Sequence, residues 1–137
     1  MNAKRFAIGT LVGGVALFLL GFLLYGILLA KFFEANTGSA TGVSKEAMEM
    51  WALALGNLAY AALLVYVFEN WASISSFAGG LRAGLIIGLL VSLSYDLIMY
   101  GTTNIMNLTG VAGDVVVYAI MTGLAGGIIG WVLGRIK

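Results

Sequence analysis

The 137-residue chain has no cysteine, no histidine and no proline, and only 9% of its residues are charged. Without Cys and His it has no disulfide, no thiolate ligand, and neither the commonest metal ligand nor the commonest general base. A soluble domain carries about a quarter charged residues, so this chain has too little charge to cover a surface that faces water. Its formal net charge of +1 provides no basic surface for nucleic acid. The composition therefore favours a membrane protein and argues against most catalytic, metal-binding and nucleic-acid-binding classes.

Apolar residues make up 61% of the chain and gather in long runs. A helix that crosses the hydrocarbon core of a bilayer needs about 20 apolar residues. Four runs approach this length: Phe6–Ala30, Met50–Phe68, Leu81–Tyr100 and Val115–Leu133. They predict an all-α polytopic membrane protein, in which residues 1–137 form a single bundle of four transmembrane helices. Because there is no Pro, we expect no kink or break in these helices.

The connections between the runs indicate where helices begin and which side each loop occupies. Ser44 is a candidate N-cap for the second span, and Asp114 is a candidate cap for the fourth. Lys and Arg favour the cytoplasmic side of a membrane, and the five on the side of the termini outnumber the two on the other. The five are Lys4, Arg5, Arg82, Arg135 and Lys137, and the two are Lys31 and Lys45. Both termini are therefore predicted to be cytoplasmic.

Glycines recur every four residues in the third and fourth runs. Lipid tails are as apolar as Leu, so helices in a membrane associate by close packing of small residues and by polar contacts. The fourth run has two glycine flanks, and we expect its glycines to pack helices together inside the chain. A homodimer face, or a surface that docks into a larger membrane complex, is the alternative. The residues assigned to this role are Gly123, Gly126, Gly127 and Gly130.

Asp96 is the one acidic residue well inside a span. A charge at the centre of a membrane helix costs about 2.5 to 3.5 kcal/mol, so the carboxyl group is a candidate functional group. Counted from Arg82, Asp96 lies in the outer half of the membrane. Four polar or aromatic residues have a matching depth and could line one pocket around Asp96, an inference from depth alone. They are Asn57, Tyr25, Tyr100 and Tyr118.

Two interpretations of Asp96 are open. No Lys, Arg or His lies at its depth, and burial without a cation favours the neutral carboxyl group. A neutral Asp96 could be a fastener that donates a hydrogen bond to Asn57 or to a tyrosine, worth about 0.6 to 2 kcal/mol. Alternatively, a proton, a metal cation or an organic cation completes a binding site.

Two short motifs resemble small bacterial four-helix inner-membrane proteins that are grouped only as domains of unknown function. The first runs from Gly21 through Tyr25 and Gly26 to Lys31 and Phe32. The second comprises Ser94, Tyr95, Asp96 and Leu97, followed by Thr102 or Thr103 and by Asp114. The resemblance implies a multi-pass protein of the bacterial inner membrane and no established activity.

These patterns predict a membrane protein that binds or transports a small ligand or cation at an outer-half pocket centred on Asp96. The alternative is a structural or assembly subunit of a larger membrane complex. We expect no enzyme, because Ser92 and Ser94 have no neighbouring base, and no cofactor or bound metal. The bilayer and a second copy or a larger complex are the expected partners.

Overall fold

The computed structural model describes all 137 residues, and its regular elements are all helices. Four helical stretches are long and apolar enough to cross a membrane, so the prediction of an all-α protein with four candidate spans is confirmed. The first span joins α1 (Ala3–Gly21) to η1 (Phe22–Leu28), and the short α2 (Ala30–Ala35) follows it. The second joins α3 (Met50–Val67) to η2 (Phe68–Ala72). The third is α4 (Phe77–Thr102) and the fourth is α5 (Leu108–Arg135).

Both predicted helix caps are wrong. α3 begins at Met50 without a side-chain cap, and Ser44 lies six residues earlier in the loop. α5 begins at Leu108 because the side chain of Asn107 accepts a hydrogen bond of 2.7 Å from the backbone N–H of Gly110. This cap starts the helix seven residues before the predicted Val115. Asp114 consequently lies inside α5, nearly two turns from its start.

The first span is irregular although it contains no Pro, contrary to the prediction of unbroken helices. In η1 the hydrogen bonds join residues five apart, as in a π-helix, and the N–H of Leu29 donates to the carbonyl of Leu24 at 2.9 Å. At Leu29 the backbone leaves the helical conformation, with φ −116° and ψ 12°. A π-helical segment shifts the side chains after it relative to a regular α-helix and is frequent at functional sites. Tyr25 lies inside this segment.

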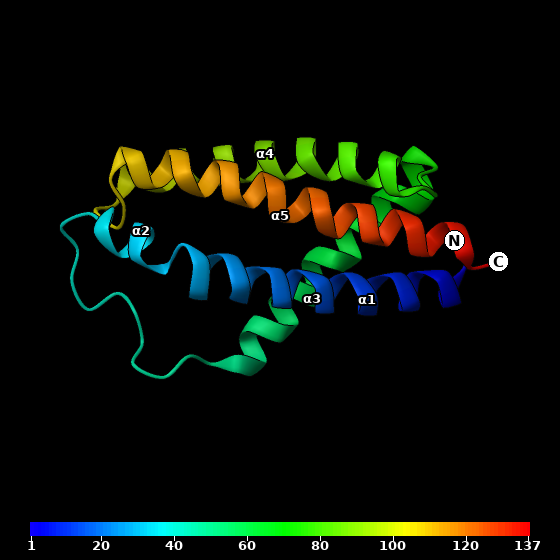
Figure 1. Cartoon of the computed structure of the whole chain (residues 1–137), viewed down its shortest axis with the longest axis horizontal. Coiled ribbons are helices and arrows are strands. Elements are labelled where there is room, and N and C mark those ends of the chain that lie inside the picture. Colours follow the sequence, from blue (N-terminus) through cyan, green and yellow to red (C-terminus); the bar gives the residue numbers. More distant parts are fainter.

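α4 and α5 lie side by side (Figure 1) and form the most extensive helix pair of the fold. Glycines lie where the two helices touch. A Cβ atom at Gly126 would lie 2.5 Å from the carbonyl oxygen of Gly80, and one at Gly84 would meet the backbone at Thr122. On the other flank of α5, a Cβ atom at Gly123 or Gly127 would lie 2.7 Å from a side-chain atom of α4. Gly130 faces the backbone of Ser76. Both glycine flanks of α5 are thus occupied by α4 of the same chain.

α1 packs on α3 and on α5, and the fully buried side chains lie where these three helices meet. The five largest are Leu17 on α1, Leu64 and Phe68 on the second span, and Ile129 and Leu133 on α5. α3 crosses the other helices obliquely, and its Met50 end leads away from α4 and α5 (Figure 1). Side chains near the start of α3 therefore do not reach α4.

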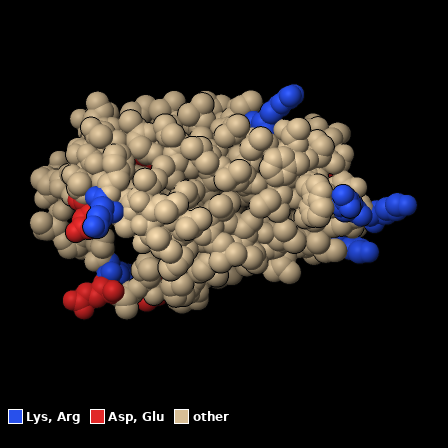
Figure 2. Space-filling view, in the orientation of Figure 1, with Lys and Arg blue, Asp and Glu red and all other residues tan.

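The two ends of the molecule differ. Both termini lie at one end, and α2 and the connection between α4 and α5 lie at the other, which we call the loop end (Figure 1). At the loop end the N–H of Gly38 donates to Ile105 O at 2.8 Å, and that of Ala40 donates to Asn104 O at 2.9 Å. Figure 2 shows basic side chains projecting at the end of the termini, whereas acidic and basic side chains are mixed at the loop end.

An ion pair holds the end of the termini together. The guanidinium of Arg5 donates to both carboxylate oxygens of Glu69, with a shortest distance of 2.6 Å, and also to the carbonyl of Ile136. The two side chains are only 20% and 12% exposed. This contact joins the first span, the second span and the C-terminus.

We expect Glu69→Gln to lower the free energy of unfolding by about 1 to 3 kcal/mol, because a bidentate, partly buried partner of Arg5 is lost. Unfolding by a denaturing detergent, followed by circular dichroism, measures it. Lys45→Gln is the control, since Lys45 and Glu49 form an exposed pair at 3.7 Å and such pairs contribute about 0 to 1 kcal/mol. An equal loss in both variants would contradict the prediction.

Candidate functional site

Asp96 is buried at the contact between α4 and α5. It continues the row of buried residues Gly80, Gly84, Gly88 and Ser92, whose four-residue spacing keeps them on the face of α4 that meets α5. The residue is 8% exposed, and its Oδ2 atom is buried without a hydrogen-bond partner. A buried polar atom normally has a partner, so an unpaired carboxylate oxygen requires an explanation.

A cavity of about 450 Å³ lies beside Asp96. Three segments line it: η1 contributes one residue, α4 contributes four and α5 contributes two. The lining residues are Tyr25, Val91, Ser92, Tyr95, Asp96, Asp114 and Tyr118. Tyr95 is 62% exposed and Val91 is 41% exposed. The α4 side of the cavity therefore reaches the molecular surface.

Asp114 is the functional candidate that sequence reasoning missed, because it was placed outside the fourth helix. It lies next to Asp96 in the cavity, and its Oδ1 accepts a hydrogen bond of 2.6 Å from the hydroxyl of Tyr25. The spacing of four residues between Asp114 and Tyr118 places both on one face of α5. This spacing, combined with a helix cap at Asn107, would have identified Asp114 as a residue inside α5 that faces the same way as Tyr118.

The cavity holds two carboxyl groups and no basic side chain. Two carboxylates held side by side would repel each other, and no basic side chain in the cavity offsets that repulsion. Ser92 does not compensate, because its hydroxyl donates to the carbonyl of Gly88 at 2.7 Å. Chemically, the arrangement is one that takes up a single positive charge, either as a proton or as a cation.

The structure brings three of the five predicted pocket residues together. Tyr25, Asp96 and Tyr118 line the same cavity, whereas Asn57 and Tyr100 do not. The predicted pairing of Asn57 with Asp96 is wrong because α3 packs on α1 rather than on α4, and the side-chain amide of Asn57 instead donates to Leu53 O at 2.8 Å.

Tyr100 is 45% exposed. The less exposed row on α4 continues from Asp96 through Met99, three residues on, and not through Tyr100. An α-helix has 3.6 residues per turn, so a row spaced by four residues drifts around the helix and must include a step of three.

Tyr60 on α3 contacts Tyr118 and Thr122 on α5. The rings of Tyr60 and Tyr118 are 5.6 Å apart, and the hydroxyl of Tyr60 lies 3.0 Å from the Oγ1 atom of the buried Thr122. This contact is a polar link between α3 and α5, and the ring of Tyr60 packs against that of Tyr118. Tyr60 therefore contacts Tyr118 and Thr122 and does not line the cavity beside Asp96.

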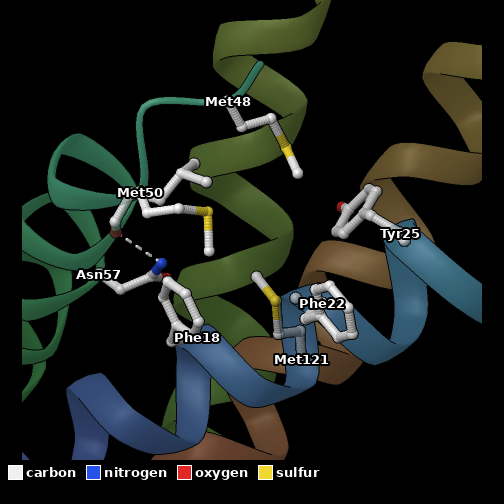
Figure 3. Close-up of a pocket in the computed structure, with 10 residues that line it drawn as sticks. Phe18, Phe22, Tyr25, Met48, Met50, Asn57 and Met121 are labelled. Carbon is white, nitrogen blue, oxygen red and sulfur yellow. Dashed lines mark hydrogen bonds between the residues drawn. The ribbon is translucent and has the colours of Figure 1, made fainter. Parts of the chain in front are cut away.

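A second cavity, of about 480 Å³, lies between the first span and the start of α3. Its lining is mainly apolar, and Tyr25 belongs to it as well as to the first cavity. Figure 3 shows its side chains around one common space, with the ring of Tyr25 at one side. The labelled residues are Phe18, Phe22, Tyr25, Met48, Met50, Asn57 and Met121. We call the first space the acidic cavity and this one the apolar cavity.

The fold and the acidic cavity together define a polytopic helical protein, suited to a membrane, with two carboxyl groups inside its helix bundle. Comparison with family models, with curated proteins and with solved structures finds no match to this chain. The resemblance to small bacterial inner-membrane proteins therefore stays a prediction.

Proposed function

We propose that this protein is an integral membrane protein that binds a small cation in the acidic cavity. One observation carries the proposal: the buried, unpaired Oδ2 atom of Asp96 lies in a cavity shared with a second carboxyl group, that of Asp114. A bound cation would supply both the missing partner and the missing charge. A proton shared by the two carboxyl groups would compete with the cation for this position.

The aromatic walls of the cavity support a cation as the ligand. The faces of tyrosine rings attract cations, particularly where water is scarce, and Tyr25, Tyr95 and Tyr118 all line the space. A small anion would meet two carboxyl groups without any basic partner. The donor set of carboxyl and phenol oxygens is thus matched to positive charge.

The distribution of basic residues supports one orientation of the protein in the membrane, with both termini on the cytoplasmic side. Both termini lie at one end, where basic side chains project (Figure 2), and such an end favours the cytoplasm. In this orientation the acidic cavity, which lies toward the loop end, belongs to the outer half of a bacterial inner membrane. Transport across the membrane would require more than the four helices, and a second copy of the chain is the simplest addition.

The alternative function, an assembly subunit that docks through the glycines of α5, has less support. It needs a free glycine surface, but Gly123, Gly126, Gly127 and Gly130 all face α4 of the same chain. The unpaired carboxylate oxygen also has no role in such docking. These two observations favour cation binding.

Labelling with a hydrophobic carbodiimide tests the proposal, because this reagent attacks protonated carboxyl groups in apolar surroundings. We expect the purified protein in nanodiscs to be labelled at Asp96 or Asp114. We also expect ammonium or tetramethylammonium to slow the labelling progressively as its concentration rises. Peptide mass spectrometry locates the label, and the exposed Glu49 is the internal control whose modification should not change. Labelling at a rate that ammonium, tetramethylammonium, sodium and potassium all leave unaltered would contradict cation binding.

A further inference from the structure

We propose that the preferred ligand is a monovalent, lipophilic organic cation, with its charged group in the acidic cavity and its apolar part in the apolar cavity. This inference rests on the proposed function and names the class of cation. It follows from the position of Tyr25, which is the shared wall of the two cavities.

The apolar cavity is built to hold an apolar group. Phe18, Phe22 and Leu53 contribute apolar walls, and Met121, which is only 5% exposed, contributes a deeply placed thioether. Met48, in the loop before α3, and Met50, the first residue of α3, extend toward the same space (Figure 3). Methionine side chains are flexible and polarisable, so a methionine-rich wall adapts to ligands of different shape.

Tyr25 lines both cavities, so the two spaces are no further apart than the length of its side chain. It lines the apolar cavity, while its hydroxyl donates to Asp114 at 2.6 Å. An apolar group that packs beside this tyrosine is therefore one side-chain length from a carboxyl group. A single amphipathic molecule that passes Tyr25 contacts both environments.

Size and charge both restrict the ligand. The cavities measure about 480 and 450 Å³, and sites for drug-sized molecules span about 300 to 1,000 Å³. The carboxyl pair lacks one positive charge, and the apolar cavity contains no acidic residue that could pair with a second. A single cationic centre attached to an aromatic or branched apolar group satisfies these limits, whereas a dication or a fatty acid does not.

Three probes separate the contributions of charge and apolar surface. Tetramethylammonium supplies the charged group alone, benzyltrimethylammonium adds one aromatic ring, and neopentylbenzene is the uncharged isostere of the latter. We expect calorimetry on the protein in nanodiscs to show that benzyltrimethylammonium binds at least about tenfold more tightly than tetramethylammonium, because its ring is buried. Neopentylbenzene should bind much more weakly than its charged counterpart.

A variant that fills the apolar cavity tests where the ring binds. Gly21 lines this cavity, and the nearest atom to a Cβ atom placed there is the sulfur of Met121, at 3.7 Å. Gly21→Leu should therefore remove the tenfold preference and leave tetramethylammonium binding intact, which also reports that the variant is folded. Gly56→Leu is the matched control, because a Cβ atom there has no neighbour within 4 Å. If Gly21→Leu does not fold, Phe22→Ala should reduce the same preference by removing one wall.

The outcomes distinguish this inference from the proposed function. Equal affinity for tetramethylammonium and benzyltrimethylammonium would overturn the lipophilic-cation inference and leave the cation site standing. Binding of neopentylbenzene as tight as that of benzyltrimethylammonium would also overturn it, because the apolar cavity would then be a site for neutral or lipid-like groups. No binding of either cation would overturn the lipophilic-cation inference, and it would overturn the proposed function as well only if ammonium, sodium and potassium also left the carbodiimide labelling unaltered.

Discussion

Asp96→Asn is expected to weaken tetramethylammonium binding by about 10- to 150-fold, because a contact with a charged group contributes about 1.5 to 3 kcal/mol. The amide has nearly the shape of the carboxyl group but cannot exchange a proton for a cation. Calorimetry on the protein in nanodiscs measures the effect. Asp114→Asn should cause a comparable loss, since Asp114 is the second carboxyl group of the acidic cavity.

Glu49→Gln is the matched control for Asp96→Asn. It removes one carboxylate from the loop end, where Glu49 is exposed and accepts a hydrogen bond from the indole of Trp51 at 2.9 Å. We expect it to bind tetramethylammonium as the wild type does. If Asp96→Asn also retained full affinity, Asp96 would not belong to the binding site.

The same position distinguishes a binding site from a fastener between helices. If Asp96 is a fastener, Asp96→Leu removes its hydrogen bond and lowers the free energy of unfolding. If Asp96 belongs to a site, the unpaired oxygen already costs stability, so Asp96→Leu should leave the unfolding free energy unchanged or raise it. We therefore expect equilibrium unfolding and cation binding, both measured on Asp96→Leu and on Asp96→Asn, to separate a loss of binding from a loss of stability.

Gly126→Leu is expected to have the largest effect on stability, a loss of about 3 kcal/mol or more. A Cβ atom at Gly126 would lie 2.5 Å from Gly80 O and 3.2 Å from the Cα atom of Gly84. These neighbours are backbone atoms, which cannot rotate away as a side chain can. Overpacking of a flexible contact costs about 1 to 3 kcal/mol, and a rigid backbone contact should lie at or beyond that limit.

Unfolding of Gly126→Leu by a denaturing detergent, with Gly56→Leu as the control, measures this effect. The control has the same change in helix propensity but has open space around its Cβ position. Gly126→Leu should also lose cation binding, because Asp96 and Asp114 lie on the two helices that it forces apart. Equal stability of the two variants would contradict the close approach of α4 and α5.

The sequence was sufficient for the four spans because hydrophobic length is a property of each segment alone. The candidate site depended on more than this. Position along a helix gives the depth of Asn57 and Asp96 but not the direction in which either side chain points. Those directions depend on which helices are neighbours, and α3 packs on α1. Similar depth in the membrane predicted that five residues would share one pocket, and only three of them, Tyr25, Asp96 and Tyr118, line the same cavity.

Two local features had weak signals in the sequence. Asp114 follows several residues that are typical of loops, so the cap at Asn107, and with it the early start of α5, was overlooked. The π-helical segment around Tyr25 contains no Pro, and hydrophobic composition does not distinguish hydrogen bonds four residues apart from bonds five apart. The position of Tyr25 between the two cavities depends on this segment.

Contacts tie the chain together at both ends of the molecule, and the acidic cavity lies between them, beside Asp96. At the loop end the backbone pairs Gly38 with Ile105, and at the other end Arg5 joins Glu69 to the C-terminus. With both ends tied, the exposed side chains of Val91 and Tyr95 mark the accessible flank of the acidic cavity. A lipophilic cation that enters by this flank would come from among the acyl chains, and its partitioning into one leaflet would then set the concentration that the carboxyl groups encounter.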